Sequence, residues 1–423
     1  MNILILGSGG REHAFAEKIR SSKHCNMLYV GPGNSGTEKI ATNLKISPND
    51  FPAVKKQVLQ HKINMVIVGP EDPLVNGIHD FFLKDAELRE VMIIGPQAIG
   101  AKLEGSKNFA KEFLNRHKIP TAAHKTFNKN EIKEAENFLT SLSPPYVLKA
   151  DGLAGGKGVL ILDNIEEAKQ ELYNMLWDKK FGSASNQVVI EEFLAGIELS
   201  CFVMTDGETY KILPTAKDYK RIGEGDKGLN TGGMGAVSPP PFVDKTFMDK
   251  VEKRIIKPTV EGLKKDQIPY KGFLFIGLIK VKNNPFVIEY NVRMGDPETQ
   301  AVLPRIKNDI LEVFISIHTK NLKAQDIIID KKSAVTVVAV SGGYPEKYEK
   351  NHTIVGLETV TDSKVFHAGA VFNNGEIVTS GGRVLSVTSL AESYKEALTM
   401  SYENLEKIHF ENMYYRKDIG FDL

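Results

Sequence analysis

Four short apolar runs in the first hundred residues are each followed by a glycine, and this repeat constrains the fold more than any other feature. Segments with helical periodicity, such as Glu12–Ser21 and Phe51–His61, lie between the runs. Alternating strands and helices predict a parallel sheet covered by helices. Ligands of such sheets bind at the carboxyl ends of the strands, where the glycine-rich segments would meet. The runs are Ile3–Leu6, Met27–Val30, Met65–Val68 and Met92–Ile94.

The pattern changes after about residue 101, where strands begin to dominate. A helix over Ser106–His117 leads into this part, and a second helix over Ile165–Leu176 interrupts it. From residue 326 a smaller α+β unit is expected, which starts with a strand at Ala334–Val340 and ends in a helix over Leu390–Ile408. The strands between the first helix and this unit are expected at Tyr146–Ala150, Gly158–Leu162, Gln187–Phe193, Leu199–Thr205, Tyr210–Pro214, Gly272–Val281 and Pro285–Asn291.

Composition narrows the class of protein and of partner. The chain has 423 residues with a formal net charge of +1, which gives no field that would favour nucleic acid or a membrane surface. Its two cysteines, Cys25 and Cys201, form no Cys-x-x-Cys pair, so we expect neither a zinc site nor a disulfide framework. No apolar stretch approaches the roughly 20 residues of a spanning helix. These features predict a cytoplasmic protein with small-molecule partners.

The glycine turn after the first run resembles half of a dinucleotide-binding fingerprint. Glu12 stands where the third glycine belongs, and Tyr29–Pro32 offers no acidic residue after the second run. A nicotinamide enzyme is therefore disfavoured. The peptide N–H groups of Gly9 and Gly10 at a helix start would still cradle a phosphate, and the alternative is a tight turn without a ligand.

A second glycine-rich segment follows Lys149, between two predicted strands. It differs from a Walker A loop, because its glycine spacing is one residue short, Gly158 replaces the required Ser or Thr, and a strand follows it. A flexible loop whose N–H groups fold over a triphosphate fits this pattern better than a disordered surface hairpin. The segment runs Asp151, Gly152, Leu153, Ala154, Gly155, Gly156, Lys157, Gly158.

Polar side chains alternate at the end of the last long apolar strand. Glu289, Asn291 and Arg293 would share one face of it. A carboxylate beside an amide oxygen suits Mg²⁺, and Arg293 could hold a carboxylate or a phosphoryl oxygen. The alternative is a polar strand face at a sheet edge.

Two further constellations are less specific. One is the glutamate-rich strand end at Glu191, Glu192 and Phe193, with Glu198 beyond it, where the simpler reading is solvated carboxylates. The other combines cations with a glycine loop that could grip an anionic, hydroxylated substrate, against the alternative of a solvated loop. Its residues are Lys217, Asp218, Lys220, Arg221, Asn230, Thr231, Gly232 and Gly233.

Taken together, these segments resemble the phosphoribosylamine–glycine ligase family of the ATP-grasp superfamily. They lie in the family's order over about three-quarters of the chain, and SGGYP (341–345) and GGRVLSV (381–387) near the C-terminus look similar too. The matching stretches are GSGGREH (7–13), GPGNSGT (31–37), GPEDPLVNG (69–77), LEGSK (103–107), LKADGLAGGKGV (148–159), VIEEFLAGIE (189–198), KDYKRIGEGDKGLNTGGMGAVSP (217–239) and EYNVRMGDPETQ (289–300).

The resemblance implies three units: an N-terminal parallel α/β domain (1–103), a two-lobed ATP-grasp unit (104–325, flexible lobe about 120–192) and a C-terminal α+β domain (326–423). It implies that Lys107 and Lys149 contact ATP phosphates and that loop 152–158 closes over them, with Asp151 and Glu192 in the same site. Glu191 and Phe193 would hold adenine through backbone groups, and Glu198 the ribose. Glu289 and Asn291 would carry Mg²⁺ or Mn²⁺.

The implied reaction joins glycine to 5-phosphoribosylamine at the expense of ATP, through glycyl phosphate, in purine biosynthesis. Arg293 and Lys149 would stabilise the transferring phosphoryl group, in a monomer or a homodimer. The expected substrate-binding residues are Gly9, Gly10, Gly33, Asn34, Arg293, Asp296 and the cation-and-glycine set between Lys217 and Gly233.

Two other functions stay open at this point. A carboxylase or a formate-dependent ligase acting on a related ribonucleotide would share the ATP and metal residues and differ in the acid that it activates. An ATP-binding regulatory module without turnover is a different class of protein, against which the intact Glu289, Asn291 and Arg293 argue.

Overall fold

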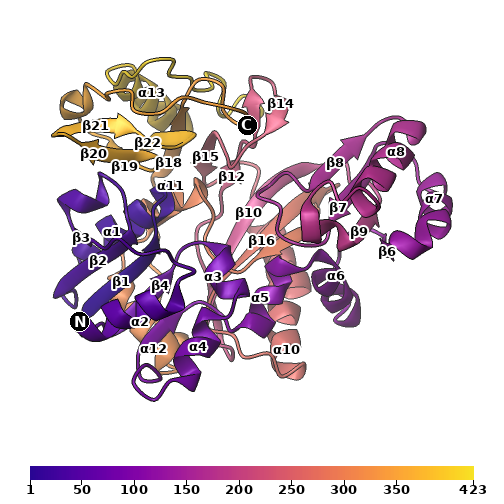
Figure 1. Ribbon diagram of the computed structural model, residues 1–423, viewed down its shortest axis with the longest axis horizontal. Coiled ribbons are helices and arrows are strands. Elements are labelled where there is room, and N and C mark those ends of the chain that lie inside the picture. Colours follow the sequence, from indigo (N-terminus) through magenta and orange to yellow (C-terminus); the bar gives the residue numbers. More distant parts are fainter.

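The computed structural model describes all 423 residues and begins with the predicted parallel sheet (Figure 1). The strand order is β3-β2-β1-β4-β5, and every pairing is parallel. Only the two-residue β3 was not expected, because such a short strand leaves no periodicity. The strands are β1 (Asn2–Gly7), β2 (Met27–Pro32), β3 (Thr42–Asn43), β4 (Met65–Val68) and β5 (Met92–Ile94), and the helices are α1 (Gly10–Arg20), α2 (Phe51–Gln60), α3 (Glu71–Val75), α4 (Ile78–Lys84) and α5 (Ala98–Gly105).

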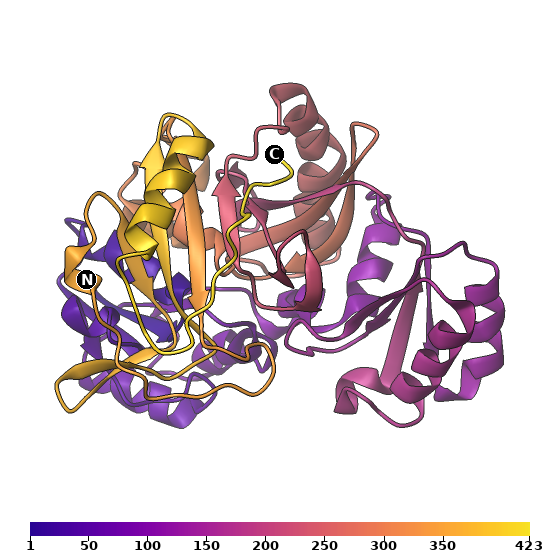
Figure 2. The same ribbon diagram turned by 90° about the horizontal axis from the view of Figure 1, so that it is seen from above.

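A small lobe with its own sheet follows α6 (Lys107–Arg116). Its strands are antiparallel in the order β6-β9-β7-β8, and α7 and α8 cover them. Thirteen buried residues form a core separate from the others, so this lobe is held together by itself. Figure 2 shows it projecting away from the other sheets. The elements are β6 (His124–Asn128), α7 (Ile132–Thr140), β7 (Tyr146–Ala150), β8 (Val159–Leu162), α8 (Ile165–Leu176) and β9 (Gln187–Glu191).

A second antiparallel sheet, β11-β10-β16-β17, forms the large lobe. Residues of this sheet share one hydrophobic core with β1, β4 and the helices around them, so the N-terminal sheet and the large lobe pack as a continuous body. The strands are β10 (Ile197–Thr205), β11 (Tyr210–Ile212), β16 (Gly272–Val281) and β17 (Asn284–Asn291). The helices are α9 (Lys245–Val251), α10 (Lys257–Lys265), α11 (Glu298–Val302) and α12 (Ile310–His318), with a π-helical turn over Glu252–Ile256.

The third large sheet, β12-β15-β18-β22-β19, joins segments from both sides of residue 326. β15 pairs with β18 through four residues, beginning with Gly235 opposite Val337. The segment 217–238 therefore extends the C-terminal sheet although it lies inside the range expected for the ATP-grasp unit. The strands are β12 (Lys217–Asp218), β15 (Gly235–Ser238), β18 (Ser333–Val340), β19 (Lys364–His367) and β22 (Arg383–Ala391); α13 (Tyr394–Leu405) packs on them.

Two predictions of secondary structure were wrong in part. The helix expected over Leu390–Ile408 begins only at Tyr394, because β22 continues to Ala391 and the Ser393 side chain then caps the helix at Glu396 N. The glycine-rich stretch expected as a loop contains a hairpin, β13 (Arg221–Gly223) with β14 (Lys227–Asn230). A second unexpected hairpin joins β20 (Ala370–Asn373) and β21 (Glu376–Thr379). None of the helices is both long and apolar enough to span a bilayer.

Candidate active site

Buried lysines gather around one carboxylate at the base of the small lobe. Glu191, the last residue of β9, lies 2.9 Å from Lys149 on β7 and 2.9 Å from Lys111 on α6. All three side chains are at most 6% exposed. Burial lowers the pKa of Lys111 to about 8, although the adjacent Glu191 acts in the opposite direction. Lys107, at the start of α6, adds a fourth charge, and its ammonium makes no ion pair.

The predicted metal ligands lie opposite these lysines at the end of β17. Burial alone would raise the pKa of Glu289, but Lys220, Lys149 and Lys107 outweigh it, so the pKa is lowered and the carboxylate stays charged. Glu289 nevertheless makes no direct ion pair, and Asn291 Oδ1 accepts only a long 3.4 Å hydrogen bond from Arg293. Two hard oxygen donors without close protein partners fit a divalent cation such as Mg²⁺ or Mn²⁺.

Arg293 is more heavily paired than its sequence position suggests. Its guanidinium lies 2.7 Å from Glu104 of α5 and 3.1 Å from Glu71 of α3. Glu104 also accepts a hydrogen bond from Val292 N at 2.8 Å. Both carboxylates belong to segments quoted above for the family resemblance, yet neither was singled out. These two ion pairs hold the Arg293 guanidinium in one orientation, and a group that positions a reactant must be held in this way.

The glycine loop between β7 and β8 stands largely free of the rest of the protein. A Cβ at Gly155 would meet nothing within 4 Å, and one at Gly156 only the carbonyl oxygen of Thr231 at 3.9 Å. Lys157 is exposed. Both glycines have positive φ, +55° and +77°, which L side chains rarely adopt. The loop tip therefore faces the 217–233 segment, as expected for a loop that covers a ligand.

The residues at and after the end of β9 differ in their contacts. The Glu191 side chain is committed to lysines and does not serve the adenine contact expected there, which was assigned to the backbone. Glu192 accepts a 2.8 Å hydrogen bond from Ala123 N, which ties the strand to the linker before β6. Phe193 is 41% exposed, and Glu198 pairs with Lys220 at 3.2 Å.

Asp218 and Lys220 lie beside Glu289, one of the expected metal ligands. With Glu198 and Glu289 they line one small depression. Burial and the neighbouring Glu198 raise the pKa of Asp218, against the opposing effect of Lys220. Lys220 is thus surrounded by carboxylates beside the expected metal ligands, whereas the sequence analysis placed it with the substrate residues.

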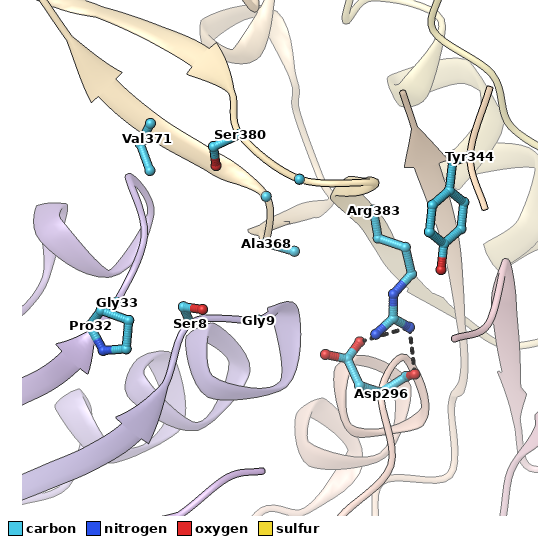
Figure 3. Close-up of a pocket in the computed structure, with 12 residues that line it drawn as sticks. Ser8, Gly9, Pro32, Gly33, Asp296, Tyr344, Ala368, Val371, Ser380 and Arg383 are labelled. Carbon is cyan, nitrogen blue, oxygen red and sulfur yellow. Dashed lines mark hydrogen bonds and ion pairs between the residues drawn. The ribbon is translucent and has the colours of Figure 1, made fainter. Parts of the chain in front are cut away.

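A cavity of about 480 Å³ opens where the N-terminal domain meets the C-terminal sheet (Figure 3). Ser8 and Gly9 reach it from the loop before α1, and Gly33 from the end of β2. A Cβ at Gly9 would lie 2.8 Å from the Asp296 carboxylate and 2.9 Å from that of Glu12, and Gly7, which also faces Glu12, has a positive φ of +127° that favours glycine. The N-terminus of α1, an eleven-residue helix, thus begins at the cavity and favours an anion there.

Arg383 supplies the cationic side chain of this cavity. It donates to the carbonyl oxygens of Asp296 at 2.6 Å and Gly232 at 2.8 Å, and it lies 3.4 Å from the Asp296 carboxylate. Figure 3 shows it between Asp296 and Tyr344, with Ser380 on the opposite wall. Arg383 and Arg11 together outweigh the effect of burial, so the pKa of Asp296 is lowered.

The remaining substrate residues expected from sequence fall into two groups. Gly232 lies at the rim, where its N–H donates to the Tyr344 hydroxyl at 3.1 Å, and Gly233 packs against Pro297. Thr231 donates to the Lys220 carbonyl, and Arg221 to that of Gly228, so both brace their own hairpin. Asn230 ends β14 opposite Arg221.

Three of the expected substrate residues lie outside the cavity lining or have their side-chain polar groups already paired. Gly10 is buried inside α1 against Gln300 and does not line the cavity. The Asn34 side chain is buried and fully hydrogen-bonded. Its Nδ2 donates to the carbonyls of Ser8 and His367, and its Oδ1 accepts from two peptide N–H groups of its own loop. Lys217 points towards the C-terminus, 3.0 Å from Asp422. Their role in substrate binding stays a prediction.

Several cavity residues were missed because they lie in the C-terminal quarter of the chain. The motifs SGGYP and GGRVLSV contained the signal, but no role was assigned to them. Glu298, whose pKa is raised to about 7 by burial and the nearby Asp218, was also missed. The C-terminal residues at the cavity are Tyr344, Ala368, Gly369, Val371, Ser380, Gly381 and Arg383.

Comparison with known families accounts for most of the length of the chain. Three models match in order: the phosphoribosylglycinamide synthetase N domain at residues 1–104, its ATP-grasp (A) domain at 105–299 and its C domain at 334–422. The chain belongs to the phosphoribosylamine–glycine ligase family. The C-domain match covers the six residues of the cavity wall from Ala368 to Arg383, to which the sequence motifs had assigned no role.

Individual phosphoribosylamine–glycine ligases agree with this membership. The enzyme of Caldanaerobacter subterraneus is 45% identical over 99% of both chains, and that of Haemophilus influenzae is 44% identical over 100% of this chain and 98% of its own. The crystal structure of the Thermotoga maritima ligase superposes with a TM-score of 0.85 at 34% identity, covering 99% of this chain and all of that one. A biotin carboxylase domain from Hydrogenobacter thermophilus, with a TM-score of 0.71 at 17% identity, shares the fold alone.

Proposed function

We propose that this chain ligates glycine to 5-phosphoribosylamine, with conversion of ATP to ADP and phosphate, in purine biosynthesis. The observation that carries the proposal is that one segment, residues 289–296, contributes side chains both to the lysine cluster and to the cavity. Its beginning supplies Glu289 and Asn291 beneath the lysines, and its end supplies Asp296 to the cavity that Arg383 and the α1 N-terminus line. A nucleotide and an anionic sugar bound on the two sides would therefore meet at Arg293.

ATP would lie between the two lobes. Lys107 and Lys149 would contact its phosphates, and Gly152 to Gly158 would close over them. The backbone at Glu191 and Phe193 would receive adenine, with Glu198 near the ribose. Mg²⁺ or Mn²⁺ held by Glu289 and Asn291 would neutralise charge on the phosphates.

The phosphoribosylamine would occupy the cavity of about 480 Å³. Its phosphate would lie against the N–H groups at the start of α1 and against Arg383, since both favour an anion. Asp296 lines the same cavity and is a polar side chain available to the ribose hydroxyls, whereas both backbone groups of Gly232 are already paired, with Tyr344 and with Arg383. The 1-amino group would then point along the 289–296 segment towards the nucleotide.

The chemistry needs no protein nucleophile. The glycine carboxylate attacks the γ-phosphorus of ATP, the bond to the β-γ bridging oxygen breaks, and glycyl phosphate and ADP result. The amine of phosphoribosylamine then attacks the acyl carbon, releases phosphate and loses a proton, which leaves glycinamide ribonucleotide. Lys149 and Arg293 would stabilise the charge of the transferring group, and the glycine loop would exclude water from the acyl phosphate.

The deciding measurement is ADP release with ATP, Mg²⁺ and freshly generated phosphoribosylamine, with and without glycine. We expect ADP only when both substrates are present, in a one-to-one ratio with glycinamide ribonucleotide. Turnover with formate or bicarbonate in place of glycine would show that a different acid is activated. A folded protein that binds ATP and turns over none of these acids would point to a regulatory module.

A further inference from the structure

The ion-paired triad of Lys111, Glu191 and Lys149 at the base of the small lobe has a net charge of +1. Glu191 is a single carboxylate between two ammonium groups, those of Lys111 and Lys149, and all three are almost fully buried. A buried cluster with a net positive charge is stabilised by an additional anion. A phosphate of ATP at Lys149 would supply that charge.

The two lysines are held differently. Lys111 Nζ also donates to Thr121 Oγ1 at 2.7 Å, and this hydroxyl donates to the carbonyl of Val287 on β17 at 2.7 Å. Lys111 is therefore anchored to the large lobe. Lys149 Nζ lies 2.9 Å from Glu191 Oε1, yet that oxygen receives no hydrogen bond, and the only other partner of Nζ is the Ile288 carbonyl at 3.4 Å.

We propose that Lys111 is a positioning residue that neutralises Glu191 and so keeps Lys149 available to the nucleotide. Without Lys111, Glu191 and Lys149 would form a neutral, self-sufficient buried pair, and a phosphate would have to break it. With Lys111 in place, Glu191 remains neutralised when Lys149 turns to ATP. This inference rests on the proposed contact between Lys149 and ATP, and it assigns Lys111 no contact with the substrate.

The test measures Mg-ATP affinity by titration calorimetry together with steady-state kinetics. Lys111→Met should weaken ATP binding about tenfold and raise KM for ATP by a similar factor, with kcat changed much less. Glu191→Gln should bind ATP within about threefold of the wild type, because Lys149 is no longer held. The double variant Lys111→Met/Glu191→Gln should recover most of the lost affinity. Recovery on removing a second buried group distinguishes positioning from general damage to the fold.

Lys18→Met is the matched control, since Lys18 is a partly buried lysine that bonds to the Ile306 carbonyl far from the cluster. It should leave ATP affinity unchanged. Additive losses in the double variant, or a Glu191→Gln variant that alone loses tenfold, would overturn the proposal. If Lys111→Met does not fold, the ATP affinity of Glu191→Gln alone tests the proposal. A wild type that binds ATP without ligating glycine would refute the proposed function only, whereas one that does not bind ATP would refute both.

Discussion

Arg383 and Asp296 meet across the boundary between the C-terminal sheet and the loop that follows β17. The guanidinium donates to the Asp296 carbonyl at 2.6 Å and lies 3.4 Å from its carboxylate, while Asp296 also accepts from Arg11 N at the start of α1. Three parts of the chain that are distant in sequence thus converge on one wall of the cavity. The proposed sugar-phosphate site depends on this convergence.

Arg383→Ala is expected to weaken the phosphoribosylamine site selectively. The loss of a partly buried charged donor should cost about 2 kcal/mol of binding, or roughly 30-fold in KM for phosphoribosylamine. KM for ATP should stay nearly constant, because Arg383 does not reach the lysine cluster. Steady-state kinetics with each substrate varied in turn would measure this. Arg89→Ala, at an exposed arginine, is the control, and a larger change for ATP than for phosphoribosylamine would contradict the assignment.

Glu289→Gln should abolish most turnover without unfolding the protein. The amide keeps the shape of the side chain but removes the charge proposed to hold the divalent cation, so kcat should fall about 10²–10³-fold. The Mg²⁺ concentration that gives half-maximal rate should rise as well. Glu90→Gln is a suitable control, because that carboxylate is 92% exposed and its one ion pair, with Arg89, is long at 3.7 Å. Full activity of Glu289→Gln would rule out the metal role.

The N-terminal sheet and most strands of the lobes could be predicted because their signals are local. Apolar runs that end in glycine give β1, β2, β4 and β5, and a Ser106 cap gives α6. Pairings between distant segments leave no such signal. Nothing near Lys217 indicates that β12 and β15 extend a sheet built from residues beyond 333, or that Lys217 itself would pair with Asp422.

The site was predictable in its residue types and less so in its contacts. Glycines and lysines in motif order predict a nucleotide site, but the pairing of Arg293 with Glu71 and Glu104 joins residues about 200 positions apart. The same holds for Arg383, whose partners Gly232 and Asp296 come from other segments. Such contacts depend on how whole elements pack, and no spacing rule in one sequence encodes them.

Two buried histidines should make the protein less stable in mild acid. His13 Nδ1 accepts from His367 N at 2.8 Å, and the His367 ring bonds to Ser35 Oγ at 2.8 Å. Burial lowers the pKa of each ring from 6.5 to about 3, with Lys39 adding to the effect. The unfolded chain therefore binds more protons between about pH 3 and 6.5, so stability is lost as the pH falls below 6.5.

Urea unfolding at about pH 7.5 and about pH 5.5 would measure this loss, at about 1 kcal/mol for each histidine. His13→Asn retains an acceptor near the Nδ1 position and cannot be protonated, so its pH dependence should be smaller by that amount. His409→Asn, at an exposed histidine, should leave the dependence unchanged. Equal slopes for His13→Asn and the wild type would show that the pKa of His13 is not lowered.

Arg416 should be the residue in the C-terminal tail whose loss costs most stability. Its side chain has no exposed area and lies 2.7 Å from Asp418 and 2.6 Å from Asp226 of the β13–β14 turn, above the ring of Tyr219. Arg416→Met should lower the free energy of unfolding by about 2–3 kcal/mol. The loss is no larger because both carboxylates are partly exposed and can be rehydrated. Urea unfolding would measure it, with Arg89→Met as the exposed control. A loss equal to that of the control would mean that the tail does not hold the hairpin through this arginine.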